Sequence, residues 1–260
     1  MLKILKYSFY DLMRSRWSYV YFLFYLLLGS VLLFLNNDLS KAVITLMNII
    51  IILVPLIATI FGVMYFYNSR EFTELLLAQP LKRSSIFLGQ FLGVAGSLTL
   101  SLVLGLGLPF VLYGLFQSGV IVNFALLILI GAFLTFIFAG LAFNIAIFNE
   151  NKIKGFGYAV LLWLFMAVIY DGLFLLALIA FEEYPLDSFS LAATVFNPID
   201  LSRILILLEL DISALLGYTG AVFKKFLGTQ LGFLISGAVL ILWTLLPVWS
   251  LYRKAKKKDF

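Results

Sequence analysis

The sequence predicts an all-α polytopic membrane protein with six transmembrane helices, and composition and hydropathy patterning carry this prediction. Hydrophobic residues make up 63% of the chain and charged residues only 12%, whereas soluble domains have about 25% charged residues. The mean hydropathy is +1.11. We therefore expect residues 1–260 to form a single transmembrane domain.

Six apolar runs are long enough to cross a bilayer, whose hydrocarbon core needs about 20 helical residues. They cover approximately residues 17–35, 42–67, 86–116, 123–148, 156–181 and 229–251. A seventh crossing through 188–210 is not expected. It would bury Asp200 and Arg203 and would export the basic C-terminal tail.

The basic residues fix the expected orientation, because loops on the cytoplasmic side carry an excess of Lys and Arg. With the N-terminus inside, every basic residue lies on the cytoplasmic side except Lys41, Arg203, Lys224 and Lys225. We therefore expect a multi-pass protein of a bacterial inner membrane with both termini in the cytoplasm. Basic residues that gather at span ends give no indication of nucleic-acid binding.

Residues 1–16 predict an interfacial helix. Leu2, Leu5 and Leu12 fall on one side, and Lys3 and Lys6 fall on the other. Such helices lie in the plane of the lipid headgroups. The alternative is an N-terminus whose charges only set the topology.

Residues 70–83, R-E-F-T-E-L-L-L-A-Q-P-L-K-R, form a charged amphipathic segment between the second and third spans. An apolar face with charged neighbours is typical of a surface helix, and a proline ends such a helix. We interpret the segment as a docking helix for a soluble partner. The expected contact residues are Glu71, Phe72, Glu74, Leu75, Leu76, Gln79, Pro80 and Arg83.

The segment 182–228 is expected on the outer side, with helices that dip into the outer leaflet or cap the bundle. Asn197, Pro198 and Asp200 precede a helical repeat of leucine and isoleucine, and Arg203 lies within it. Proline is tolerated in the first turn of a helix. A second helical stretch is expected from Asp211. A lid and a docking surface for a periplasmic partner both remain open, with Asn197, Pro198, Asp200 and Arg203 as candidates.

Asp171 is the most unusual residue within a span. A carboxylate there costs about 2.5–3.5 kcal/mol on insertion scales, so it should face the bundle interior or a water-filled cavity. No basic residue is expected in a span core, so Tyr170, Asn144 or a hydroxyl is the expected partner. The interaction is either a functional polar contact on a translocation route or dimer seam, or a structural hydrogen bond. Asn144 is the second intramembrane polar candidate.

The sequence also lacks the usual residues of enzyme chemistry. It has no Cys and no His, which removes thiol chemistry and the commonest metal ligand. It has no Gly-Lys-Ser/Thr phosphate loop. We therefore predict a non-enzymatic chain with no catalytic residues, no metal site and no cofactor of its own.

Three stretches carry a resemblance to a known family: T-E-L-L-L-A-Q-P-L-K-R at 73–83, Y-D-G-L-F-L-L at 170–176 and N-P-I-D-L-S-R-I-L at 197–205. Together with six spans, they resemble the membrane subunits of ABC-2 type (type V) ABC transporters. The first stretch is common to many ABC-2 permeases. The third is similar to the NosY subgroup, which serves nitrous-oxide reductase maturation.

The resemblance implies that residues 1–16 are an elbow helix and that residues 70–83 are the coupling helix that seats in an ATPase. It further implies a homodimer with two copies of a NosF-like cytoplasmic ATPase, which binds ATP and Mg, and a NosD-like periplasmic β-helix protein. The complex would support copper–sulfur centre assembly by transport or mechanical action. Alternatives are a generic ABC-2 exporter of lipid, peptide or drug, and a membrane anchor or scaffold of a surface or gliding apparatus.

Overall fold

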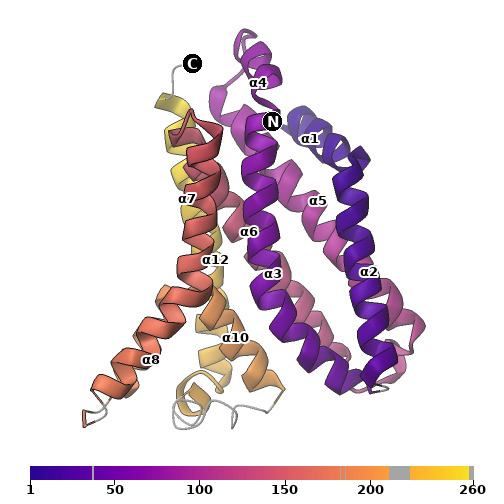
Figure 1. Cartoon of the computed structure of the whole chain (residues 1–260), viewed down its shortest axis with the longest axis vertical. Coiled ribbons are helices and arrows are strands. Elements are labelled where there is room, and N and C mark those ends of the chain that lie inside the picture. Colours follow the sequence, from indigo (N-terminus) through magenta and orange to yellow (C-terminus); the bar gives the residue numbers. More distant parts are fainter. Residues whose placement is uncertain (37, 182, 185, 211–222, 258–260) are drawn as a thin grey trace.

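The computed structural model describes residues 1–36, 38–181, 183–184, 186–210 and 223–257 (Figure 1). All regular structure in these ranges is helical, and six helices are long and apolar enough to cross a membrane. The prediction of an all-α polytopic membrane protein is confirmed at this level. The spans are formed by α2 (Arg16–Asn36), α3 (Leu39–Asn68), α5 (Arg83–Leu112), α6 (Ile121–Phe148), the continuous segment α7–α8 (Lys152–Leu164 and Tyr170–Ala180, joined by the π-helical turn Phe165–Ile169) and α12 (Gln230–Lys257).

The third span is displaced by a few residues from its predicted bounds, since it runs from Arg83 to Leu112 instead of from 86 to 116. Gly114 follows it with a φ of 93°, a conformation that only glycine adopts without steric cost. A short 3₁₀ turn, Leu115–Gln117, comes next. The local backbone therefore ends the span before the apolar pattern ends.

The core of the bundle forms where α3, α5 and α6 pack together. Phe66 from α3 packs edge-on against Phe143 from α6, with ring centroids 5.7 Å apart. Phe91 from α5 contacts the same Phe143 ring at 5.9 Å. Edge-to-face pairs of this kind add to the stabilisation from burial. Spans five and six lie at the periphery. Only 6% of the apolar window of Lys152–Ala180 is buried.

The N-terminal helix α1 (Leu2–Arg14) crosses α5 at close range. Gly89 and Gly93 make this crossing possible, because a Cβ atom at Gly93 would lie 2.6 Å from the Cβ of Ser8. The G-x-x-x-G pattern of the third span therefore seats a helix of the same chain.

Helices α9 (Asp187–Phe196) and α10 (Pro198–Glu209) form a hairpin, since they meet at 114° around Asn197. Trp243 Nε1 of α12 donates a hydrogen bond to the carbonyl of Val195 at 3.0 Å, near the middle of the sixth span. Helix α10 packs against α3, α6 and α12, and Ile199 and Leu201 are fully buried. The hairpin is thus inserted among the spans rather than placed over them. The second helical stretch expected from Asp211 lies outside the described residues.

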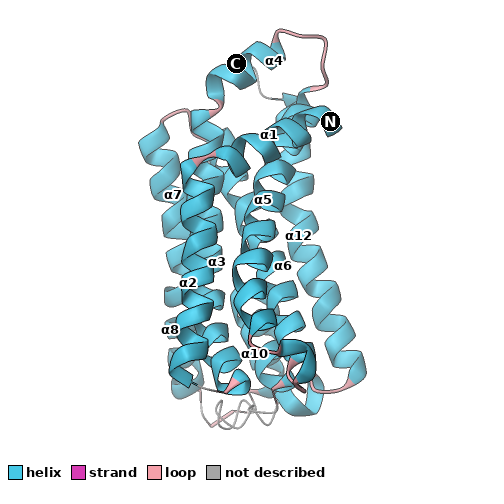
Figure 2. Cartoon of the chain, turned by 90° about the vertical axis from the view of Figure 1, so that its right-hand side faces the viewer, coloured by secondary structure: helices cyan, strands magenta, loops and turns pink. Residues whose placement is uncertain are grey.

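The two ends of the bundle differ (Figures 1 and 2). Helix α4 (Arg70–Leu77) projects from one end, which also carries the N-terminus and the C-terminal end of α12. The C-terminal end of α8 and the ends of α2 and α3 that face each other lie at the other end. We call these the α4 end and the hairpin end.

Candidate functional site

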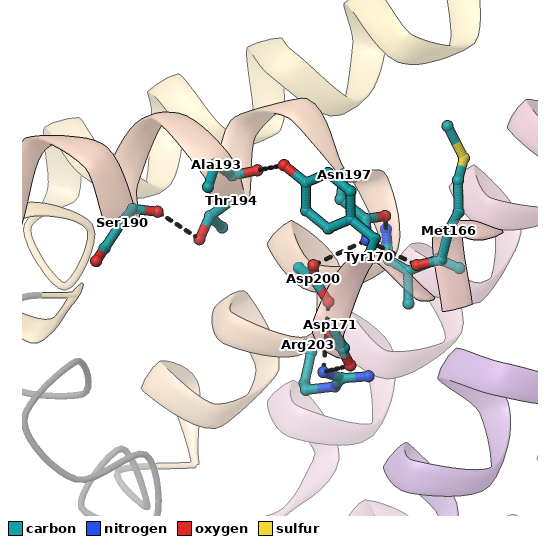
Figure 3. Close-up of polar contacts among 10 residues, drawn as sticks. Met166, Tyr170, Asp171, Ser190, Ala193, Thr194, Asn197, Asp200 and Arg203 are labelled. Atoms are coloured by element: carbon teal, nitrogen blue, oxygen red, sulfur yellow. Dashed lines mark hydrogen bonds and ion pairs between the residues drawn. The ribbon is translucent and has the colours of Figure 1, made fainter. Parts of the chain in front are cut away.

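A polar cluster joins the α9–α10 hairpin to span five (Figure 3). Arg203 Nη1 donates to Asp171 Oδ2 at 2.7 Å and to Asp200 Oδ1 at 3.3 Å. The side chains of Arg203 and Asp171 are 26% and 30% exposed. We define the polar cluster as Tyr170, Asp171, Asn197, Asp200 and Arg203.

Asn197 organises the turn of the hairpin. Its Oδ1 accepts a hydrogen bond from the backbone N–H of Ile199 at 3.0 Å, and Pro198 occupies the first helical position of α10. An N-cap followed by proline is a favourable helix start. Asn197 Nδ2 donates to Asp200 Oδ2 at 2.8 Å. The N-P-x-D sequence therefore caps α10 and positions Asp200 at the same time.

Span five contributes backbone as well as side-chain contacts to the cluster. Asn197 Nδ2 also donates to the carbonyl of Met166 at 2.8 Å, within the π-helical turn. Tyr170 donates its hydroxyl hydrogen to the carbonyl of Ala193 at 2.7 Å. π-Helical turns interrupt the α-helical hydrogen-bond pattern, and they are found frequently at functional sites. Met166 lies near the middle of the 29-residue span Lys152–Ala180, so the hairpin turn lies at mid-depth.

The expected partners of Asp171 were wrong. A basic residue, Arg203, does lie beside it, because α10 is inserted into the bundle instead of remaining outside. Asn144 is not near it in the hydrogen-bond network. Asn144 Nδ2 donates to the carbonyls of Gly140 and Pro247 at 2.8 and 2.7 Å, which joins α6 to α12.

The cluster borders a cavity of about 300 Å³ between α8 and the hairpin. Phe174, Leu178 and Ile204 supply apolar walls beside Asp171 and Arg203. Two carboxylates face one guanidinium, so the cluster carries a surplus of negative charge when both are ionised. Pairing with one another allows these charged side chains to remain within apolar surroundings. Asn197 and Pro198 are buried and Asp200 is 8% exposed, so little of this segment is open to a soluble partner.

Helix α4 is the second candidate site, and its two sides differ. Phe72 stacks on Tyr7 of α1 with ring centroids 4.5 Å apart. Thr73 is buried, and its Oγ1 accepts a hydrogen bond from Gln90 Nε2 of α5 at 2.8 Å. These contacts fix the inner side of α4 to two other helices.

The outer side of α4 is free of the bundle. Glu71 and Glu74 are exposed, and Leu75 is 68% exposed. Glu74 pairs with Arg70 at 2.9 Å on the helix surface. A shallow cleft of about 480 Å³ adjoins the helix and is lined by Glu74, Leu77, Ala78 and Arg83.

The expected contact residues of this segment do not share one face or one helix. Phe72 points inward and Leu75 outward, and Leu76 is half-buried. The helix ends at Leu77, so Gln79 and Pro80 lie in the exposed link to α5, and Arg83 is the first residue of α5.

Sequence reasoning missed Thr73, Gln90 and Tyr7 at this site. Gln90 was the available signal, because a lone amide in an apolar span needs a hydrogen-bond partner. Within the described ranges, no group of three or more acidic side chains is arranged to hold a metal ion.

The chain matches no protein-family model and no curated protein sequence, so its function is inferred from the two sites described above.

Proposed function

We propose that this chain is the transmembrane subunit of an ABC-2 type ABC transporter, which couples ATP hydrolysis by a separate ATPase to transport or mechanical action. The observation that carries the proposal is the arrangement of α4. It is a short helix between spans two and three, anchored on one side and exposed on the other. Because the sequence has no phosphate loop of its own, an ATPase partner would supply ATP and Mg binding.

The anchored side of α4 supplies a route for movement. Force applied to Glu71 or Glu74 would reach α1 through the Phe72–Tyr7 stack and α5 through the Thr73–Gln90 hydrogen bond. Only the five residues 78–82 separate α4 from α5. Helix α4 would therefore act as a coupling helix and α1 as an elbow helix, with both on the cytoplasmic side of a bacterial inner membrane.

The assembly that we propose is a homodimer with two ATPase copies. Span five supports it, because only 6% of its apolar window is buried within one chain and its long exposed face is available to a second copy. The N-P-I-D-L-S-R-I-L stretch favours the NosY subgroup, with NosF-like and NosD-like partners and a role in copper–sulfur centre assembly.

One observation favours the generic ABC-2 exporter as a second candidate. Asn197, Pro198 and Asp200, on which the NosY resemblance rests, are buried in the hairpin turn. Buried residues cannot form a docking surface for a soluble periplasmic protein unless the hairpin moves. Co-purification would separate the two candidates, since only the NosY role requires a periplasmic β-helix protein in the complex.

The coupling role is tested by reversing both exposed charges of α4, Glu71→Lys and Glu74→Lys, with the ATPase co-expressed. The Arg70–Glu74 pair is about half exposed and contributes about 0–1 kcal/mol, so the bundle should stay intact. We expect loss of ATPase co-purification and of stimulated ATP hydrolysis.

Glu150→Lys is the matched control, because Glu150 is an exposed acid in the α6–α7 link at the same end but outside α4. It should retain the ATPase. Full ATPase retention and stimulation by the double variant would refute the coupling role of α4.

A further inference from the structure

One exposed face of α12 changes from apolar to basic along the helix. Residues three or four positions apart lie on the same side of a helix. Leu242, Leu246 and Trp249 follow this spacing, and each is more than half exposed. Arg253 and Lys256 continue the same side toward the α4 end and are also exposed. We call these five residues the α12 face.

Two aromatic rings hold the cations of the α12 face in place. The guanidinium carbon of Arg253 lies 3.6 Å from the centroid of the Trp249 ring, and Lys256 Nζ lies 4.2 Å from the centroid of the Tyr252 ring. Cation–π contacts of this kind attract a cation to the ring face without neutralising its charge. Both charges are therefore positioned and remain available to an anion.

Neither cation has an acidic partner in the part of the chain that the structure describes. No ion pair joins Arg253 or Lys256 to a described carboxylate, and the sequence of α12 contains no Asp or Glu. An excess of basic residues at cytoplasmic span ends sets the orientation of a membrane protein. That rule accounts for basic residues at this end, but it does not require them to stack on exposed rings.

The Arg253 guanidinium is oriented to bind a phosphate. A separation of 3.6 Å from the ring centroid corresponds to a parallel stack, so the Trp249 ring covers one face of the guanidinium plane. The five N–H bonds of arginine lie in that plane, and they can donate in pairs to two phosphate oxygens. Lys256 lies about 4.5 Å further along the helix axis, at 1.5 Å per residue, and adds another donor for the same group.

The apolar part of the α12 face indicates that this phosphate belongs to a lipid. Leu246 precedes Arg253 by about 10 Å and Leu242 precedes it by about 16 Å, at 1.5 Å per residue. One leaflet supplies about half of the roughly 30 Å hydrocarbon core, so the leucines lie at acyl-chain depth when Arg253 lies at the headgroups. Trp249 then has the position that tryptophan favours at a membrane interface. A soluble polyanion would contact the cations and leave the leucines uncovered.

We propose that the α12 face binds an anionic phospholipid whose headgroup has no ammonium group, such as phosphatidylglycerol. Arg253 donates to two phosphate oxygens, and Lys256 donates to the same phosphate. Trp249 lies beside the glycerol, and the two leucines contact an acyl chain. The ammonium of a phosphoethanolamine or phosphocholine headgroup would lie near two cations, which disfavours both headgroups. The inference does not depend on the proposed ATPase partner.

The experiment is native mass spectrometry of the purified full-length chain, mixed with phosphatidylglycerol, phosphatidylethanolamine and phosphatidylcholine of identical acyl chains. One basic residue near the membrane surface favours an anionic lipid by about fivefold. For one to two such residues, we expect phosphatidylglycerol to be retained about five- to thirtyfold more than either of the other lipids. Arg253→Gln/Lys256→Gln should abolish most of this preference. Equal retention of the three lipids by the unaltered chain would overturn the proposal.

Lys152→Gln/Lys154→Gln is the matched control, because it removes two exposed lysines at the start of α7, outside the α12 face. Its net charge equals that of the α12 double variant, and it should retain the preference. An equal loss of preference in the two double variants would show that net charge alone attracts the lipid, which would refute a site on α12.

Substitutions of Trp249 test the stacked geometry. Trp249→Phe keeps a ring beneath Arg253 and should keep most of the retained phosphatidylglycerol, whereas Trp249→Leu keeps only apolar surface and should lower retention several-fold. Unchanged retention in Trp249→Leu would contradict the positioned guanidinium on which the proposal rests. Glycerol phosphate at millimolar concentration should not displace the lipid. Complete displacement by this soluble phosphate would refute the assignment to a membrane lipid.

Discussion

Arg203 of the α9–α10 hairpin and Asp171 of the fifth span form an ion pair, with 2.7 Å between Nη1 and Oδ2. The pair lies 32 residues apart in sequence and close to mid-depth in the bundle. Asp200 shares the same guanidinium nitrogen at 3.3 Å. One cation therefore holds two carboxylates from two different helices.

Removing the Arg203 guanidinium should lower the free energy of unfolding more than removing the charge of Asp171. Arg203→Met leaves two carboxylates without compensation in partly buried surroundings, and we expect it to lower the free energy of unfolding by about 3–5 kcal/mol. Asp171→Asn leaves Arg203 paired with Asp200, so a loss of about 1–3 kcal/mol is expected. Reversible unfolding in mixed micelles measures both values. An Arg203→Met variant as stable as Asp171→Asn would contradict the shared-cation arrangement.

Asn197 should be needed for both the cap and the attachment of the hairpin. Asn197→Ala removes the cap acceptor and both donated hydrogen bonds, and we expect a loss of about 2–4 kcal/mol from one cap and two buried bonds. Asn197→Ser keeps a capping oxygen and should recover about 1 kcal/mol of it. Hydrogen exchange of the α9–α10 amides is the measurement. Faster exchange confined to Asn197→Ala would show that the cap alone matters, whereas we expect it in both variants.

The close approach of α1 and α5 predicts a sharp difference between two glycines. Gly93→Ala would put a methyl group 2.6 Å from the Cβ of Ser8 and should cost about 1–3 kcal/mol by overpacking. Gly96→Ala is the matched control, since the nearest atom, in the Phe9 ring, lies 3.8 Å away. Thermal unfolding in detergent compares the two. Equal melting temperatures would show that α1 does not pack against α5 at Gly93.

The hydrogen bond between Thr73 and Gln90 predicts a non-additive pair. Thr73→Val leaves the fully buried Gln90 amide without its partner, and a loss of about 1–3 kcal/mol is expected. Gln90→Leu in the Thr73→Val background should recover most of this loss, because both polar groups are then gone. Thr73→Ser keeps the hydroxyl and serves as the control. Additive losses in the double variant would mean that the two side chains do not interact.

The spans could be predicted from the sequence because their signal is long and local. Six apolar runs predict the number of spans correctly, but several bounds differ by a few residues: the fifth span begins at Lys152 instead of 156, and α12 continues to Lys257 instead of ending at 251. The segment at 70–83 was predicted as one amphipathic unit, but the helix ends at Leu77. Phe72 was predicted to contact a soluble partner, but its ring stacks on Tyr7, a residue 65 positions earlier in the chain.

The polar cluster could not be predicted in full because its pairing is tertiary. A charge count places Arg203 outside the membrane, since that rule treats each basic residue as part of a loop. The neglected signal was local: Asp200 and Arg203 stand three residues apart on a helix that also carries Leu201, Ile204 and Leu205. A helix with so much apolar surface needs a buried position, and its charges then need partners such as Asp171.

The separation of 32 positions between Asp171 and Arg203 also imposes an order on biogenesis. Ribosomes synthesise the chain from the N-terminus, so span five leaves the ribosome before Arg203 does. Insertion of an aspartate at this depth costs about 2.5–3.5 kcal/mol. The flanking Leu173, Phe174, Leu175 and Leu176 must therefore carry the span through the insertion machinery unaided. The ion pair forms only after the hairpin follows, so it secures a helix that is already in the bilayer.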